Sequence, residues 1–278
     1  MKRMKGKDYW KKHLSRGAIY VFLIVVSFIS VFPLYWAFIS AFNNTAEILG
    51  GRMLPSTHFV ENFKNLIETQ QVGRAMINSF ATSILQTLMT LLVCSIAGYG
   101  FEIYHDKYKD IVMTILMLAM MVPFVAILVP MFQMFSKMKL LNTWVGFFLP
   151  NISTPFMIMF FRNSARNFPK DTIEAARIDG LNELQIFVRM FVPMMRPTYA
   201  AAATMTFMNA WNAYLWPKVI MSTSDSVTMP MLVSNTNTGY VIDFGVVMMA
   251  VTLCSLPTVV VFFLLQKQFT NAVAGSVK

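Results

Sequence analysis

Charged residues are scarce in this sequence. Asp, Glu, Lys and Arg make up 13% of the 278 residues, whereas about 25% is typical of soluble domains. Hydrophobic residues make up 56% of the chain, and its mean hydropathy is +0.55. This composition excludes a soluble globular domain as the main part of the chain and predicts a protein of the lipid bilayer.

Motifs for catalysis and for metal binding are also missing. The two cysteines, Cys94 and Cys254, lie inside apolar runs and belong to no CxxC pair or Cys/His cluster. The three histidines are far apart and lack metal-ligand spacing, and no GxxxxGK(S/T) loop is present to bind nucleotide phosphates. We expect no metal site and no bound cofactor on this chain. An ATPase, if one drives it, must be a separate polypeptide.

Six apolar segments are long enough to cross a bilayer, for which about 20 helical residues are needed. We therefore expect an all-α integral membrane protein with six transmembrane helices in a single domain over residues 1–278. Prolines fall inside some of these segments, and we expect kinked rather than broken spans, because neighbouring helices can satisfy the freed carbonyl groups. The prolines are Pro33, Pro123, Pro130 and Pro257, and the spans are expected near residues 17–42, 76–101, 111–135, 143–161, 198–221 and 244–265.

Acidic residues are absent from the interior of the expected spans. All 13 Asp and Glu fall in loops or at span ends, whereas proton-coupled carriers place ionisable groups at mid-membrane. With the N-terminus inside, 17 of the 23 Lys and Arg lie on the cytoplasmic side. We expect a multi-pass protein of the plasma membrane with both termini in the cytoplasm. The same distribution explains the net charge of +10 without nucleic-acid binding.

A long polar stretch interrupts the apolar runs at residues 169–197. Asp171 and Glu174 have the spacing of a capping box, which predicts a helix that begins at Asp171. Gly180 should end this helix, because glycine readily adopts the left-handed conformation. The stretch is therefore expected to open with one short helix.

A second short helix should follow. Asn182 precedes Gln185 by three residues and repeats the capping pattern, and Pro193 should end the helix before the fifth span. Together the two helices predict a helix-turn-helix on the cytoplasmic face.

Two roles for this helix-turn-helix are equally compatible with the residues. Ala175 and Ala176 allow another surface to approach closely, and Glu174, Arg177 and Asp179 supply charges that would align a partner. Alternatively, the hairpin is amphipathic and lies on the lipid head groups.

The segment EAARIDG resembles the EAA loop of bacterial ABC importer permeases. Met190 and Val192 replace the Ile and Leu usual in that loop. The stretches LLNTWVGFFLP, NAWNAYLWP and NAVAGSVK extend the resemblance over nearly the whole chain, to the six-span maltose-type subunit of the carbohydrate branch. The family usually has an acidic residue near Ala213 and a final AGAVKG, where this chain has AGSVK. The matching positions of the loop are Glu174, Ala175, Ala176, Gly180 and Pro193.

This resemblance implies the partners and the energy source. The chain would pair with a second, homologous permease, rest on two ATPase subunits that carry ATP and Mg²⁺, and receive sugar from an extracellular sugar-binding protein. The EAA loop at residues 169–197 would dock in a cleft of the ATPase. The coupling residues implied are Glu174, Ala175, Ala176, Arg177, Asp179, Gly180 and Pro193.

Polar and aromatic residues inside two spans are candidates for the translocation path, because sugar hydroxyls need hydrogen bonds and sugar ring faces need apolar surfaces. In the second span Ser83 and Gln86 belong to a polar stripe at helical spacing. Packing between helices explains that stripe as well, and aromatic side chains often occupy the membrane interface. The candidates in the fifth span are Asn209, Trp211, Asn212 and Tyr214.

The sequence therefore leaves two functional classes open. The first is an ABC importer permease for oligosaccharides. The second, on the residues alone, is a self-contained secondary or facilitative carrier of a neutral solute. They differ in the energy source, so a requirement for ATP and for added subunits discriminates between them.

Overall fold

The computed structural model describes the backbone of residues 6–237 and 242–275, and the side chains of residues 16–237 and 242–264. The described residues form helices and no strand, which confirms the all-α class. The last three residues of NAVAGSVK lie outside the described part, as does the side chain of every residue in that stretch. The chain divides into two units, residues 1–69 with 236–253 and residues 70–235 with 254–278.

The first unit contains a long apolar helix and the connections that follow it. Asn44 caps the next helix in a capping box with Glu47. The buried amide of Asn62 donates hydrogen bonds to the carbonyl oxygens of Ala41 and Asn43, each at 3.0 Å. These bonds satisfy backbone carbonyl groups just after the end of α1. The helices are α1 (Gly6–Ser40), α2 (Thr45–Leu49), α3 (Phe59–Thr69) and the first part of α15 (Phe244–Gly275).

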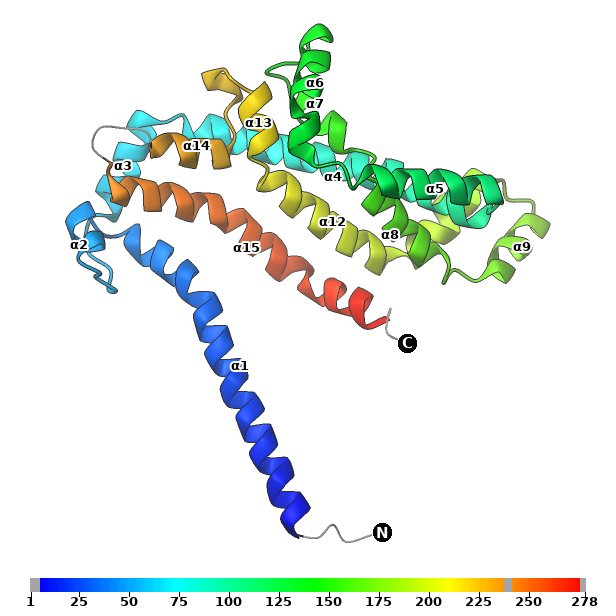
Figure 1. Cartoon of the computed structure of the whole chain (residues 1–278), viewed down its shortest axis with the longest axis horizontal. Coiled ribbons are helices and arrows are strands. Elements are labelled where there is room, and N and C mark those ends of the chain that lie inside the picture. Colours follow the sequence, from blue (N-terminus) through cyan, green and yellow to red (C-terminus); the bar gives the residue numbers. More distant parts are fainter. Residues whose placement is uncertain (1–5, 238–241, 276–278) are drawn as a thin grey trace. The chain divides into compact units, whose positions relative to one another are not determined.

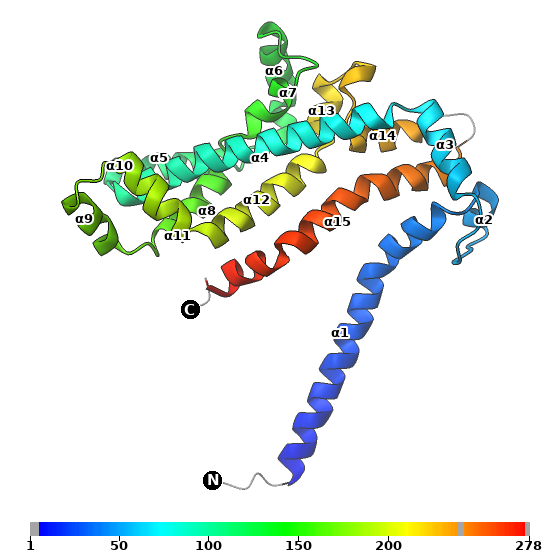
Figure 2. The same ribbon diagram turned by 180° about the vertical axis from the view of Figure 1, so that it is seen from behind.

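The second unit is built around the long helix α4 (Val72–Ile103), against which α8 (Pro155–Ala165) and α12 (Arg196–Trp211) pack, as the two opposite views in Figures 1 and 2 show. Buried apolar side chains, among them Cys94 and Phe161, fill the space between these helices. The remaining helices of this unit are α5 (Lys107–Ala119), α6 (Phe124–Lys137), α7 (Trp144–Phe148), α13 (Leu215–Ile220), α14 (Met229–Thr236) and those of the 169–197 stretch.

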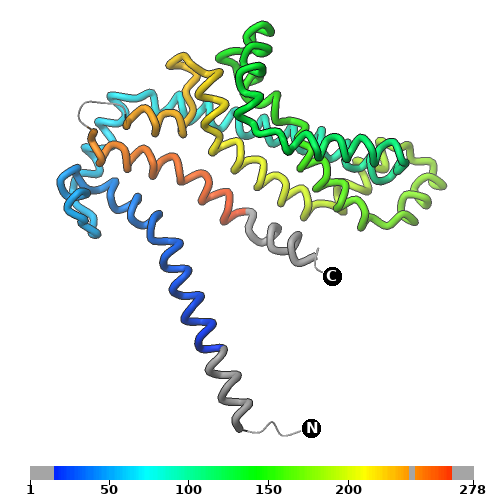
Figure 3. The backbone as a smooth tube through the Cα atoms, in the orientation of Figure 1, coloured from blue at the N-terminus to red at the C-terminus, as the bar shows by residue number. Residues whose placement is uncertain are grey.

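The third expected span is broken rather than kinked. Helices α5 and α6 meet at an angle of 98°, and the chain turns sharply between them (Figure 3). Pro123 precedes α6, and it disfavours helical conformation in the residue before it and donates no amide hydrogen bond. Our expectation of a kink was therefore wrong for Pro123, although Pro33, Pro130 and Pro257 do lie inside helices.

Two other expected spans are also interrupted. The fourth consists of α7 and a 3₁₀ turn, bent by 52° from α8. The fifth, expected over 198–221, ends as a helix at Trp211 and resumes as the short helix α13. The Asn212 side chain donates to the Met208 carbonyl at 2.9 Å, so it satisfies a carbonyl group of the last turn of α12.

Among the described residues, three helices are long and apolar enough to cross a membrane, or up to five if each bent pair forms one span. The three are Arg16–Ser40, Val72–Ile103 and Phe244–Leu264, and they coincide with the first, second and sixth expected spans. Several apolar helices are thus present, and the breaks explain why the count by length stays below six.

Candidate functional site

The polar stretch forms the expected helix-turn-helix at one end of α4 (Figure 2). Helix α9 (Lys170–Ile178) is followed by Gly180, whose φ of +82° is left-handed as expected. The next helix, α10 (Glu183–Ile186), begins with the expected capping box: Asn182 Oδ1 accepts from the Gln185 amide at 2.9 Å, and Gln185 Oε1 from the Asn182 amide at 3.0 Å. Local sequence signals alone determine this turn.

Two details of the hairpin differ from expectation. Asp171 does not cap α9, because Pro169 occupies the cap position and Asp171 lies in the first turn, where its charge still faces free amides. Pro193 does not end the second helix. A π-helix at Phe187–Phe191 precedes it, in which the Val192 amide bonds to the Phe187 carbonyl five residues back. A wider π turn accommodates a proline whose ring would clash with the carbonyl of a regular α turn.

The inner face of the hairpin is part of a hydrophobic core. Ile173 and Ala176 of α9 are 3% and 4% exposed. They are buried with Phe168 and Phe191 and with Tyr99 of α4, and the ring centroids of Tyr99 and Phe191 are 4.9 Å apart. The inner face of α9 and the end of α4 therefore share one close-packed core.

The outer face of α9 carries most of the expected coupling residues. Glu174, Ala175, Arg177, Asp179 and Gly180 are exposed, whereas Ala176 is buried. Beside this face lies a groove of about 410 Å³. Asp171, Ala175 and Asp179 line the groove at helical spacing, together with Thr172, Ala176, Leu181 and Met190.

Arg177 forms an ion pair within the hairpin. Its Nε donates to Glu183 Oε1 at 2.8 Å across the turn of the hairpin. This bond, together with one from Tyr104, lowers the pKa of Glu183. Burial, and then the hydrogen bond to Glu183 and its charge, raise the pKa of Tyr104 at the end of α4. The Arg177–Glu183 ion pair connects α9 to α10. Glu174, in contrast, is exposed and forms no ion pair in the described part of the chain.

The candidates for the translocation path separate into two groups. Gln86 and Asn209 line one cavity of about 390 Å³. Ser83 is fully buried and does not line it, and its hydroxyl has no hydrogen-bond partner among the described residues. Trp211 is 1% exposed, and its Nε1 donates to the Cys254 carbonyl at 2.9 Å. Tyr214 is partly exposed and bonds to Ser234. The geometry thus favours Gln86 and Asn209 over the aromatic candidates.

The structure adds a lining residue that the sequence did not single out. Thr206 lies on α12 one turn before Asn209 and lines the same cavity, with Asn151 and Thr154 from the break before α8. The spacing of Thr206 and Asn209 on one helical face was the available signal.

Comparison with known proteins identifies the family. A family profile described as "binding-protein-dependent transport system inner membrane component" matches residues 95–275. The chain belongs to this family. It is a permease subunit of a transport system and not an enzyme, and the resemblance suggested by the EAA loop is confirmed.

Relatives of this permease include named sugar-transport proteins. It is 39% identical to the "Lactose transport system permease protein LacG" of Rhizobium radiobacter over 93% of this chain and 95% of the relative. It is 31% identical to the "Arabinooligosaccharides transport system permease protein AraQ" of Halalkalibacterium halodurans, over 91% and 93%.

Solved structures show the same fold. A chain of a bacterial ABC transporter involved in the import of the acidic polysaccharide alginate superposes on the permease with a TM-score of 0.81 at 17% identity, covering 97% of this chain and all of that one. The inward-facing MetNI methionine ABC transporter gives a TM-score of 0.52 over 72% of this chain and 94% of that one, at 19% identity.

A cluster of charges connects the helices next to the helix-turn-helix of the permease. The Arg162 side chain, 6% exposed, donates from Nε to Glu102 at 3.2 Å and from Nη2 to Asp110 at 2.6 Å. Arg166 shares Glu102 at 3.2 Å, and His105 shares Asp110 at 2.9 Å. The ends of α4 and α8 and the start of α5 are therefore held together shortly before α9 begins.

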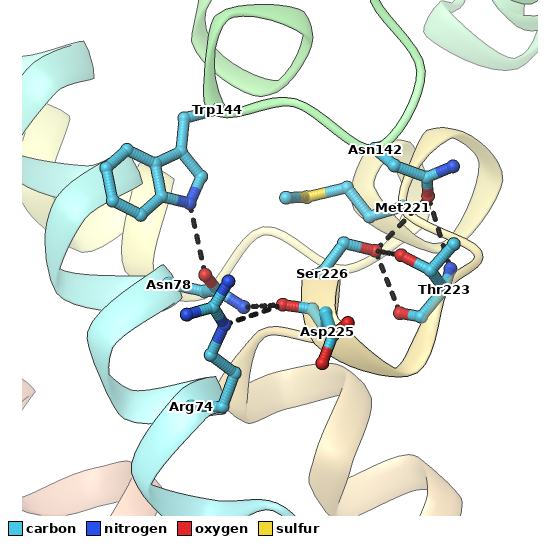
Figure 4. Close-up of a pocket in the computed structure, with 8 residues that line it drawn as sticks. All are labelled: Arg74, Asn78, Asn142, Trp144, Met221, Thr223, Asp225 and Ser226. Carbon is cyan, nitrogen blue, oxygen red and sulfur yellow. Dashed lines mark hydrogen bonds between the residues drawn. The ribbon is translucent and has the colours of Figure 1, made fainter.

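A second polar cluster lies at the other end of α4 (Figure 4). Asn78 accepts from Trp144 Nε1 at 3.1 Å and donates to the Asp225 carbonyl at 2.8 Å. Asn142, whose φ is +59°, accepts from the amides of Ser222 and Thr223. Asn142 and Trp144 belong to the LLNTWVGFFLP stretch that carried part of the resemblance, and these bonds show that they hold the connection after α13 in place.

Proposed function

We propose that this permease is one half of the translocation path of an ATP-driven importer of oligosaccharides. Its path would be formed by six spans: α1, α4, the α5–α6 pair, the α7–α8 pair, α12 with α13, and α15. Breaks within such spans are tolerated in membranes where the irregular backbone is buried in protein or lines a cavity. In this arrangement residues 1–278 form a single transmembrane domain with both termini in the cytoplasm of a bacterial cell.

The observation that carries the proposal is the two-sided character of α9. Its outer face presents Glu174 and Ala175 beside a groove, while its inner face is packed against α4 through Ile173 and Ala176. A partner that moves the outer face would therefore move the transmembrane helices. Of the four apolar residues that would dip into lipid, Ile173 and Phe187 are buried in protein and Leu181 is half-buried, whereas Ile178 is exposed. Most of the apolar face is thus already used by the protein, and this favours docking to an ATPase over a hairpin lying passively on lipid.

The other components follow from the family and from related proteins. ATP and Mg²⁺ would bind to two separate ATPase subunits, and a second permease would complete the path. An extracellular binding protein would deliver the sugar; a solved structure of the alginate transporter contains a periplasmic protein bound to an alginate pentasaccharide. The relatives named for lactose and arabino-oligosaccharides support a short sugar as the substrate.

Within this assembly Glu174 would pair with a basic residue of the ATPase, and Gly180 would form the tight turn at the contact. Arg177 would act indirectly, because it is bound to Glu183. Pro193 and its π-helix would shape the return to α12. Of the path candidates, Gln86 and Asn209 would face the substrate, whereas Trp211 and Asn212 would support α12.

The test is reconstitution of this permease with its partner permease, ATPase and binding protein in proteoliposomes. We expect uptake of radiolabelled lactose or arabino-oligosaccharide to require ATP and all subunits. Glu174→Lys should abolish uptake and reduce co-purification of the ATPase, because it reverses the charge at the contact. The control is Glu68→Lys, which reverses another exposed charge, one that lies on α3 and pairs with Lys64 at 3.8 Å.

The alternative, a self-contained carrier of a neutral solute, predicts the opposite result. Uptake by this chain alone, without ATP, would establish it. Normal uptake and normal ATPase retention by Glu174→Lys would argue against coupling through α9.

A further inference from the structure

The cavity lined by Gln86 and Asn209 lies where two helix breaks meet. Met120, at the end of α5, contributes to one side, and Thr154 and Pro155, at the start of α8, contribute to another. Segments buried in a membrane tolerate irregular backbone where it lines a cavity, and transporters commonly bind substrates at discontinuous helices. The cavity thus lies at a place in the fold where a transported ligand would pass.

Two buried oxygen atoms of the residues lining this cavity have no hydrogen-bond partner among the described residues. They are Oε1 of Gln86 and Oγ1 of Thr206, and these residues are 5% and 4% exposed. Nearby hydroxyls on the same helices are satisfied internally: Thr204 donates to the Ala200 carbonyl at 2.8 Å, and Thr87 to the Ser83 carbonyl at 2.7 Å. A buried polar atom left without a partner is costly, so a ligand hydroxyl that reaches Gln86 or Thr206 would gain a bond that the protein itself does not provide.

The rest of the lining is apolar or neutral. Of the lining residues, Met157 is buried, Met120 and Phe156 are about half exposed, and Asn209 is exposed. A flat aromatic side chain with amide and hydroxyl groups around it suits a sugar ring, which has apolar faces and polar edges.

No acidic or basic residue lines the cavity. A carboxylate or phosphate on the ligand would be partly desolvated there without a counter-charge, and that is unfavourable. The volume of about 390 Å³ is near the lower end of the range of about 300 to 1,000 Å³ for small-molecule sites. The ligand is therefore small and uncharged.

We propose that this permease itself binds one or two rings of an uncharged sugar in this cavity during import, with Gln86 and Thr206 as hydrogen-bond partners of the sugar hydroxyls. The proposal rests on the proposed function and adds a sugar site on this subunit, which discriminates neutral from acidic glycans.

The test uses the complete importer in proteoliposomes, with radiolabelled lactose, maltose and arabinobiose as neutral probes and digalacturonate as the acidic probe. Uptake is normalised to the ATPase subunit that co-purifies, so poorly assembled variants are not counted as inactive. We expect Thr206→Val to raise the KM for the transported neutral sugar roughly five- to tenfold, as the loss of one hydrogen bond implies.

The control variants separate the loss of the Thr206 hydroxyl from an effect on folding. Thr206→Ser keeps the hydroxyl and should retain a KM near that of the natural permease. Thr204→Val removes a hydroxyl that is already bonded within α12 and should leave the KM unchanged. Gln86→Leu should raise the KM as Thr206→Val does, whereas Thr87→Val on the same helix should not.

Each outcome decides the proposal. Unchanged KM values for both Thr206→Val and Gln86→Leu, in an importer that transports a neutral sugar, overturn the site but leave the proposed function standing. Faster transport of digalacturonate than of all three neutral probes also overturns it. An assembled importer that transports none of the probes overturns the proposed function and the site together.

Discussion

Gly98 of α4 lies directly against Phe161 of α8: a Cβ atom at position 98 would come within 2.6 Å of the Phe161 Cβ and 2.7 Å of the Arg162 amide nitrogen. Small residues at helix crossings allow close backbone approach inside membranes, where packing is a main source of helix association. Because Arg162 follows Phe161, this approach also fixes the position from which Arg162 reaches Glu102 and Asp110.

We expect Gly98→Ala to destabilise the permease by about 1–3 kcal/mol, the usual cost of overpacking a filled interior. The contacted atoms include backbone, which cannot move aside. Thermal unfolding of the purified importer measures the change. The control is Gly100→Ala on the same helix, where an added Cβ meets nothing within 4 Å; a decrease in Tm for Gly100→Ala as large as for Gly98→Ala would contradict the explanation.

Arg162→Ala should be strongly destabilising, on the order of 3 kcal/mol, because Glu102 and Asp110 lose the buried cation that joins them and keep only the exposed Arg166 and His105. Arg166→Ala removes a cation from the same Glu102, but the Arg166 side chain is 56% exposed. That change should cost less than about 1 kcal/mol. Chemical or thermal unfolding of both variants provides the comparison, and equal effects would mean that burial of Arg162 is not what matters.

The parts of the fold that the sequence predicted are those set by local signals. The spans of α1, α4 and α15 follow from long apolar runs, and the turn of the hairpin follows from Gly180 and the Asn182–Gln185 capping box. The breaks were not predictable in the same way. Pro33 lies inside a continuous helix and Pro123 next to a 98° bend, so the outcome depends on what packs around each proline and not on the residue.

The candidate site shows the same division. Gln86 was found because polar residues recur on one face of its helix, but Thr206 lies in an alanine-rich segment where its spacing from Asn209 was the one weak signal. Trp211 and Arg177 were chosen by residue type, and their chemical groups are used within the chain, by the Cys254 carbonyl and by Glu183. Such pairings between distant residues cannot be read from one sequence.

Trp211→Phe should therefore reduce stability and leave the KM for sugar unchanged. The phenyl ring keeps the contacts with Phe207 and Phe80, while the Cys254 carbonyl loses its donor, at a cost of about 1–3 kcal/mol. Unfolding and uptake are measured on the same preparation. Tyr214→Phe, which removes an exposed hydroxyl, is the control and should change stability by no more than about 0.5 kcal/mol. A changed KM for Trp211→Phe at normal stability would show that Trp211 belongs to the translocation path.

The Arg177–Glu183 pair should order the hairpin at neutral pH. Because the pKa of Glu183 is lowered below its ordinary value of 4.5, its contribution is present above that value and is lost only as the pH falls through the lowered pKa. Hydrogen exchange of residues 170–195 should thus show equal protection at about pH 6 and about pH 8. Arg177→Ala should lower protection at both pH values, whereas Arg189→Ala, which removes an exposed and unpaired cation, should not. If protection changes between the two pH values, another titrating group orders the hairpin.

Gly180 gives the sharpest test of the hairpin geometry. Its φ is +82°, and a Cβ added there would meet nothing within 4 Å, so a substitution acts through backbone strain alone. Gly180→Ala should destabilise the turn by about 1–2 kcal/mol, and Gly180→Asn by less, because asparagine tolerates the left-handed conformation. Gly73→Ala, at an open helical position, should be harmless.

ATP-dependent uptake should follow the same order, with Asn closer to Gly than Ala is, if the turn positions α9 for its partner. The ATPase activity of the assembled complex should remain while uptake falls, because strain at the turn misplaces α9 without removing Glu174 or the groove. An Ala variant that transports as well as the Asn variant, at reduced turn stability, would show that the left-handed conformation stabilises the hairpin but is not required for coupling.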